Sequence, residues 1–429
     1  MEDIKVVLAD KYDLVVGDTF QLYYRGIIES PNPFIYDILA TCVKGKGFPR
    51  YYEFTPEEEG EYELAITVFD AKKNVLGTAT TKLVAIEPRE NTKPLNILCM
   101  GSSSTSGGQW PGEANRRLTA TDGEPTGLGF KNINFVGTCI NKTEDTHFEG
   151  YGGWMWKSFY TSANSNMWIY TDYDLNEEDQ HSIWADQFGY EWKLEAFDIR
   201  RLKFIPIGDN PGNLVESGVL KHVANAVHTD DLVFSYAHFE PVSPYYDEKT
   251  DSISFKAYCE RIGIDKIDAL YVLLGMNGLL EVKGDALTHC PEVVRQAKCL
   301  ADIFHKEFPE GKIKVMGIVM PSTMGGVGWN YGAIMPYCDG YNLRRYVLRL
   351  NELYQAWANE PEYRDFVEYV NVSGQFDSDN NFPEIEKPVN TRSKRTERMS
   401  TNGLHPTNEG YMQIADAAFR NMVKLCKEN

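Results

Sequence analysis

Two short segments carry residue types suited to nucleophilic chemistry. The run GSSST at residues 101–105 follows an apolar run at 95–98, which is typical of a strand that ends in a tight turn. A serine on such a turn exposes its hydroxyl at the rim of a sheet. The run NGLHP at 402–406 contains His405 and precedes a helical pattern. Because a serine is a poor nucleophile until a base takes its proton, this pairing predicts a serine activated by histidine.

The elements that must position these residues form an alternating pattern from residue 95 onward. The alternation of strand and helix predicts an α/β fold whose parallel sheet is covered by helices on both faces. In such a fold the loops at the C-terminal strand ends carry the site. The expected strands lie at 95–98, 133–137, 267–275, 312–319 and 367–372, and the expected helices at 291–308, 342–358 and 408–425.

Residues 1–90 show a different pattern, with several short strands and little helix. Apolar and polar residues alternate at 18–24 and 61–69, and a turn then leads into 75–86. We interpret this part as a small β-sandwich of immunoglobulin type, an accessory domain. A polar segment with two prolines joins it to a second domain at 95–429. The part of that domain around 160–255 is interpreted as a β-rich insertion.

Four stretches of the second domain resemble the sequence blocks of SGNH (GDSL-type) hydrolases. The stretches are GSSST at 101–105, EGYGGW at 149–154, GMNG at 275–278 and NGLHP at 402–406. They occur in the family's order and with its wide spacing, and the resemblance covers about 95–429. It implies the flavodoxin-like SGNH fold and a serine-dependent hydrolase.

The resemblance also implies a role for individual residues. Ser103 would be the nucleophile, and His405 would be the general base and then the acid that protonates the leaving alcohol. The oxyanion hole would consist of the backbone N–H groups of Ser103 and Gly153 and the side-chain amide of Asn277. Fixed donors of this kind stabilise the developing negative charge by roughly 3–4 kcal/mol each. A glycine at 153 lets the backbone come close.

The sequence departs from the family pattern at three positions. Ser102 and Gly278 replace aspartates, and these changes are expected to affect loop bonding more than chemistry. Asn402 stands where the family usually has the aspartate that orients the histidine. An amide oxygen can accept the imidazole N–H but cannot stabilise imidazolium by charge, and in a serine protease this exchange costs about 10⁴ in turnover. We therefore expect a Ser103–His405 dyad, with His405 held by a backbone carbonyl, by Asn402, or by a carboxylate from another loop.

Aromatic residues lie in or next to the first two blocks. They could be part of the core, or they could offer flat faces on which sugar rings stack. These candidates for substrate binding are Trp110, Tyr151, Trp154 and Trp156.

The composition of the chain argues against several classes of partner, against a membrane span and against a metal site. The chain has 429 residues and a net charge of -19, which argues against nucleic acid or anionic membrane as the main partner. No apolar stretch approaches the roughly 20 residues of a membrane span. The N-terminus shows no signal peptide, which favours a cytoplasmic protein unless a leader has been removed. The eight cysteines form no CxxC pair, so neither a zinc site nor a disulfide framework is expected, and no metal or organic cofactor is implied.

These observations lead to one preferred function and two alternatives. The preferred function is a serine esterase that removes a small acyl group, O-acetyl above all, from a carbohydrate or a similar polar substrate. The first alternative is a lipase or thioesterase of the same fold that acts on longer acyl chains. The second is a non-catalytic carbohydrate-binding relative. This alternative is considered because Asn402 stands in place of the aspartate that usually orients the histidine. The N-terminal domain is a candidate for carbohydrate binding, for packing against the cleft, or for oligomerisation.

Overall fold

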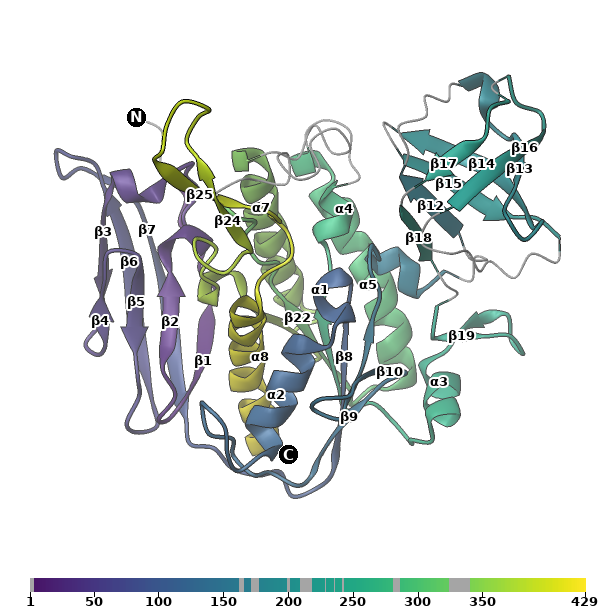
Figure 1. Ribbon diagram of the computed structural model, residues 1–429. Coiled ribbons are helices and arrows are strands. Elements are labelled where there is room, and N and C mark those ends of the chain that lie inside the picture. Colours follow the sequence, from purple (N-terminus) through teal and green to yellow (C-terminus); the bar gives the residue numbers. More distant parts are fainter. Residues whose placement is uncertain are drawn as a thin grey trace.

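The computed structural model contains an N-terminal β unit, a central α/β unit and a β insertion (Figure 1). No helix among the described residues combines the length and apolar character of a membrane-crossing segment. The structure describes residues 4–161, 166–170, 177–198, 201–208, 218–227, 229–234, 236–240, 243–280, 286–323 and 340–429.

The N-terminal β unit, residues 4–86, contains two sheets with strand orders β1-β7-β6-β3 and β2-β5-β4. In β6 the alternation predicted from sequence buries Leu64, Ile66 and Val68. These residues belong to a core of the unit's own. That this unit is of immunoglobulin type stays a prediction. Its strands are β1 (Lys11–Val15), β2 (Phe20–Tyr23), β3 (Asp37–Thr41), β4 (Lys46–Gly47), β5 (Tyr51–Phe54), β6 (Gly60–Phe69) and β7 (Val75–Ile86), with short 3₁₀ helices at Tyr24–Gly26 and Pro33–Ile35.

A seven-stranded sheet forms the centre of the α/β unit. Its order is β10-β11-β8-β21-β22-β23, and β9 pairs with β8. All pairings except the antiparallel pair β10–β11 are parallel, as the alternating sequence pattern predicts. β21 is fully buried, which agrees with its continuous apolar run. The strands are β8 (Leu95–Gly101), β9 (Ile133–Val136), β10 (Cys139–Asn141), β11 (Thr146–Gly150), β21 (Ala269–Leu273), β22 (Lys312–Met316) and β23 (Val367–Val370).

Helices cover this sheet in two groups. α2 packs with α8, and α5 packs with α7, and Figure 1 shows the two pairs on opposite sides of the sheet. The described α-helices are α1 (Ser103–Ser106), α2 (Gln109–Thr119), α3 (Phe255–Ile262), α4 (Met276–Leu280), α5 (Cys290–Glu307), α7 (Gly340–Ala358) and α8 (Asn408–Glu428). Short 3₁₀ helices lie at Trp156–Phe159, Glu177–Asp179, Ala286–Thr288 and Ser373–Gln375.

The expected β-rich insertion corresponds to a sheet between residues 166 and 240, with order β17-β16-β13-β14-β15-β12-β18. It has its own small core, which includes Trp184, Trp192 and Phe204. The strands are β12 (Asn166–Tyr170), β13 (Ile183–Ala185), β14 (Glu191–Asp198), β15 (Arg201–Pro206), β16 (Gly218–Ala224), β17 (Leu232–Phe234) and β18 (Tyr236–Glu240). Two hairpins complete the fold, β19 (Tyr246–Asp247) with β20 (Ser252–Ile253), and β24 (Glu384–Pro388) with β25 (Thr396–Ser400).

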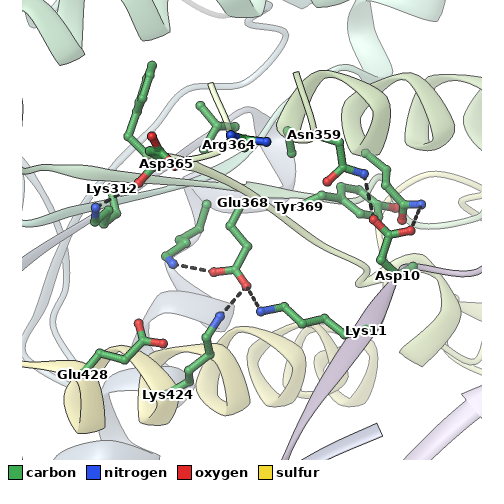
Figure 2. A pocket seen from close by; sticks show the side chains of 16 residues that line it. Asp10, Lys11, Lys312, Asn359, Arg364, Asp365, Glu368, Tyr369, Lys424 and Glu428 are labelled. Atoms are coloured by element: carbon green, nitrogen blue, oxygen red, sulfur yellow. Dashed lines mark hydrogen bonds and ion pairs between the residues drawn. The ribbon is translucent and has the colours of Figure 1, made fainter. Parts of the chain in front are cut away.

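A charged pocket lies where β1, β22, β23 and the C-terminal end of α8 meet (Figure 2). Its centre is Glu368, whose carboxylate contacts Lys314 at 2.6 Å, Lys424 at 2.5 Å and Lys11 at 3.1 Å. Burial by itself would raise the pKa of Glu368, but the charges of the three lysines hold it well below its usual range. One carboxylate therefore joins the N-terminal β unit, the sheet and the last helix.

We predict that Glu368→Gln lowers the free energy of unfolding by about 3 kcal/mol at pH 7, because it leaves three clustered lysines without their counter-charge. A carboxyl whose pKa is depressed on folding stabilises the protein above its unfolded pKa, near 4.3, and this contribution disappears as the pH falls further. Urea unfolding at pH 7 and pH 4 should therefore show a smaller difference between variant and wild type at pH 4. Glu428→Gln, in an exposed residue of the same pocket, is the control. Equal effects of the two substitutions at pH 7 would contradict the assignment.

Candidate active site

The turn after β8 places Ser103 at the C-terminal edge of the sheet. β8 ends at Gly101, Ser102 precedes the helix, and Ser103 is the first residue of the short helix α1. Ser102 is buried, while Ser103 is partly exposed. The backbone thus changes direction within two residues and leaves the Ser103 side chain at the surface of the site.

Gly101 is needed because other chain segments crowd it. It pairs with Gly150 of β11 on one side and with Leu273 of β21 on the other. A Cβ at this position would lie 2.1 Å from Thr105 Oγ1 and 2.8 Å from the carbonyl oxygen of Leu273. The close approach of three backbones brings the ends of β8, β11 and β21 together next to Ser103.

His405 reaches this edge from the segment between β25 and α8. Pro406 follows it, and Thr407 caps α8 by accepting a hydrogen bond from the backbone N–H of Gly410 at 3.4 Å. His405 Nε2 lies 2.9 Å from Ser103 Oγ, although the two residues are 302 positions apart. The structure therefore brings the two residues of the predicted dyad into hydrogen-bond contact.

The second ring nitrogen of His405 contacts Asn402, at a distance of 3.0 Å between Nδ1 and the amide nitrogen Nδ2. The amide oxygen of Asn402 accepts hydrogen bonds from the backbone N–H groups of Leu404 and His405, both at 3.0 Å. A reversed amide would direct its NH₂ group at these two donors. The backbone therefore holds the amide with its nitrogen toward the ring. Of the three groups expected to hold His405, Asn402 contacts the ring, and it does so through its amide nitrogen and not through its oxygen.

This contact decides which ring nitrogen carries the hydrogen. Burial lowers the pKa of His405 from its ordinary value near 6.5, which favours the neutral ring with one N–H group. Because Asn402 donates to Nδ1, that hydrogen lies on Nε2 and points at Ser103 Oγ. A general base needs the opposite tautomer, in which Nε2 presents a lone pair to the hydroxyl. The resting arrangement is thus a hydrogen-bonded pair that must change tautomer before Ser103 can lose its proton.

The segments that carry the predicted oxyanion donors are tied to the same edge. The backbone N–H of Tyr151 donates to Gly101 at 3.1 Å, and Asn277 Nδ2 donates to the carbonyl of Trp154 at 3.0 Å. Gly153, between them, has a φ of 75°, a conformation that favours glycine. The amide of Asn277 has a second N–H that this bond does not use. The roles of Ser103, Gly153 and Asn277 as oxyanion donors remain a prediction.

The aromatic candidates lie in the interior rather than on an open surface. Trp110 and Trp154 are fully buried and Trp156 is 1% exposed, so their ring faces pack against protein. Trp110 donates to Thr105 Oγ1 at 3.0 Å and Trp156 donates to Tyr354 OH at 2.7 Å. Tyr151 is partly exposed, and its ring stacks on Trp154 with centroids 4.2 Å apart. The structure therefore places the three tryptophans in the core, and their ring faces are not open for stacking on a sugar.

Sequence reasoning did not single out Glu149, a fully buried carboxylate next to the site. It accepts hydrogen bonds from Tyr258 OH at 2.5 Å, from the Thr138 N–H at 2.7 Å and from Tyr151 OH. Since Tyr151 stacks on Trp154, whose carbonyl holds Asn277, Glu149 anchors the loop that carries Gly153. The signal in the sequence was a charged residue directly before the glycines of the second block.

Comparison with known proteins gives distant structural likenesses. No protein-family model matches the chain, and no curated protein matches it. A family 3 carbohydrate esterase from Clostridium thermocellum shows 14% identity and a TM-score of 0.37, covering 78% of this chain and 98% of the esterase. A family 3 carbohydrate esterase from Talaromyces cellulolyticus shows 12% identity and a TM-score of 0.36, covering 78% and 99%.

A carbohydrate acetylesterase from Sinorhizobium meliloti gives a similar result, with 13% identity, a TM-score of 0.33 and coverage of 77% of this chain and 99% of the acetylesterase. TM-scores below 0.5 do not establish a shared fold.

We predict that Asn402→Asp raises kcat on an activated acetyl ester by roughly 10- to 1,000-fold, part of the approximately 10⁴ that the reverse exchange costs in a serine protease. The carboxylate can accept from the backbone N–H groups with one oxygen and from Nδ1–H with the other, which frees the Nε2 lone pair. Its charge also favours imidazolium, so the acid limb of kcat/KM, which lies below pH 6.5 in the wild type, should move to higher pH.

The matched control is Asn408→Asp, the same exchange at an exposed position three residues after His405. ¹⁵N NMR of the imidazole should report hydrogen on Nε2 in the wild type and on Nδ1 in Asn402→Asp. A folded Asn402→Asp protein with unchanged kcat and unchanged ring tautomer would contradict this account.

Proposed function

We propose that this protein is a serine carboxylesterase that removes a small acyl group, acetyl above all, from a carbohydrate or a similar polar substrate. The observation that carries the proposal is the 2.9 Å contact between Ser103 Oγ and His405 Nε2 at the C-terminal edge of a parallel sheet. Placement of both residues at the rim, where loops from several strands converge, is typical of catalytic sites in α/β folds.

In the proposed reaction, the hydrogen of the neutral His405 ring first moves from Nε2 to Nδ1, which frees the Nε2 lone pair. Ser103 Oγ then attacks the carbonyl carbon of the ester while its proton passes to His405 Nε2. The carbonyl oxygen gains the negative charge, and the N–H groups assigned to the oxyanion hole stabilise it. His405 returns the proton to the alkoxide oxygen as the C–O bond of the ester breaks, which leaves an acyl group on Ser103. Water then attacks this ester while His405 takes one of its protons, and His405 passes that proton to Ser103 Oγ as the bond to Ser103 breaks and the carboxylic acid leaves. The low pKa of His405 favours the neutral ring that both steps need.

Dense packing around the nucleophile supports a small acyl group. The indole of Trp110 lies under α1 with its N–H on Thr105, and Trp154 lies buried beside the segment that carries Gly153. Among the described residues, these two rings fill part of the interior next to the nucleophile turn. The net charge of -19 also disfavours polyanionic substrates and suits a neutral, polar substrate such as a sugar ester.

The orientation of Asn402 favours a second candidate, a carbohydrate-binding protein without catalysis. With the hydrogen of His405 on Nε2, the ring donates to Ser103 and does not accept its proton. If the change of tautomer is too costly, the Ser103–His405 pair serves only as a polar contact for a bound sugar.

We predict that Ser103→Ala lowers kcat/KM on a p-nitrophenyl acetate-type substrate by at least about 10³-fold, because no covalent intermediate can form. Ser104→Ala removes the neighbouring hydroxyl of the same short helix and should retain most activity. Equal hydrolysis by wild type and Ser103→Ala would contradict the catalytic proposal. If the wild type in that case binds sugars, the second candidate is supported.

The size of the acyl group gives a separate test. We expect acetyl esters to be hydrolysed with a kcat/KM at least about 10-fold above that of octanoyl esters, since the buried rings of Trp110 and Trp154 fill part of the interior next to Ser103 and extra methylenes would have to compete with them for space. Steady-state kinetics across a series of p-nitrophenyl esters measures this preference. A maximum at octanoyl would instead identify a lipase or thioesterase that works through the same Ser103.

A further inference from the structure

The segment that carries His405 is supported by a second stretch of chain, residues 377–383, called here the support segment. The backbone N–H of Thr401 donates to the carbonyl of Pro383 at 2.8 Å, and that of Thr407 donates to the carbonyl of Asn381 at 2.9 Å. These two bonds bracket residues 401–407, which include Asn402 and His405. The position of His405 relative to Ser103 therefore depends on where the support segment lies.

The support segment is held by Gln413 of α8 and by the N-terminal β unit. Gln413 Oε1 accepts from the Asp377 N–H at 2.8 Å and from Asn381 Nδ2 at 2.7 Å. The amide nitrogen of the same Gln413 donates to the hydroxyl of Tyr23, at the end of β2, at 3.0 Å. The N-terminal β unit thus reaches the support segment through a chain of hydrogen bonds.

Two arginines of the N-terminal β unit contact the support segment directly. Arg25 Nε lies 2.6 Å from Asp379 Oδ1, and Arg50 pairs with Asp377 and lies 3.5 Å from Asp379 Oδ2. The side chains of Arg25 and Asp379 are only 13% and 18% exposed, so water screens this pair less than an exposed one. Gly26, next to Arg25, allows the backbone of the N-terminal β unit to approach Ser373 closely, because a Cβ at this position would lie 2.2 Å from the carbonyl oxygen of Ser373.

Asp379 also connects the support segment to the other side of the histidine loop. Its Oδ1 accepts a hydrogen bond from Thr323 Oγ1 at 2.9 Å. The preceding residue, Ser322, donates its backbone N–H to the carbonyl of Gly403 at 2.9 Å. One carboxylate therefore joins the arginines of the N-terminal β unit to both segments that flank Asn402 and His405.

We infer that the N-terminal β unit is a positioning element for His405, and that Arg25 and Asp379 are its positioning residues. Arg25 and Arg50 hold the support segment, and the support segment holds the histidine loop against Ser103. Proton transfer is sensitive to displacement, since a shift of about 1 Å can cost about 10²-fold in rate. The inference rests on the proposed esterase function for its effect on rate, and it gives the N-terminal β unit a role that needs no sugar site of its own.

The test compares Asp379→Asn with Lys427→Gln. Lys427 also pairs with the N-terminal β unit, through Glu59, but it lies about 30 Å along α8 from His405. We expect Asp379→Asn to lower kcat about 10- to 100-fold with KM within about 2-fold of wild type, and Lys427→Gln to leave kcat unchanged. Arg25→Gln should lower kcat to a similar or smaller extent, and Arg25→Lys should restore part of it. The double variant Arg25→Gln/Asp379→Asn should lose no more than Asp379→Asn alone.

Hydrogen exchange of the peptide that covers residues 400–408 provides a readout independent of catalysis. We expect faster exchange there in Asp379→Asn than in wild type or Lys427→Gln, with an unchanged thermal midpoint. If wild type hydrolyses no ester, the function proposed above fails, and the exchange result alone decides this inference. Equal exchange and equal kcat in the two variants, or a loss of kcat that only follows a lower thermal midpoint, would overturn it.

Discussion

The contact of 2.9 Å between Ser103 Oγ and His405 Nε2 is the interaction on which the rest of the site depends. Its two residues are held by different kinds of structure. Ser103 stands on a turn that is fixed by the crowding of three strands around Gly101. His405 stands on a segment without regular structure, whose position comes from hydrogen bonds to its neighbours. The sheet therefore fixes the position of Ser103, whereas the position of His405 depends on contacts with other segments of the chain.

The Asn402 amide shows how one atom changes the chemistry of an otherwise complete arrangement. The backbone N–H groups of Leu404 and His405 donate to the amide oxygen of Asn402, so the amide nitrogen faces the imidazole. With an aspartate in the same place, both outer atoms would be acceptors and no conflict would arise. The same geometry therefore suits fast proton transfer with one residue and a resting, hydrogen-bonded pair with the other. Burial of His405, which keeps the ring neutral, makes the choice of tautomer decisive.

The sequence allowed the place of the candidate residues in the fold to be predicted, because parallel strands bring their C-terminal ends to one edge. Ser103 follows β8, Gly153 follows β11 and Asn277 follows β21, as the alternating pattern and the four blocks indicated. The direction of the Asn402 amide was not predictable, since it depends on two backbone N–H groups whose orientation appears only in the folded loop. The burial of Trp110 and Trp154 was left open for a similar reason, because an aromatic residue beside a site fits both a core and a sugar-binding face. The link from Arg25 to Asp379 joins residues more than 350 positions apart, and neither residue lies in a recognisable pattern.

The most direct test of the central claim is covalent labelling of the nucleophile by an organophosphate ester, followed by peptide mass spectrometry. Such a reagent reacts with a hydroxyl whose proton is removed by a neighbouring base. The account predicts that the label appears on the peptide that contains Ser103, and that His405→Ala abolishes it while the fold is retained. A label that is absent from Ser103, or one that forms equally fast without His405, would contradict the account.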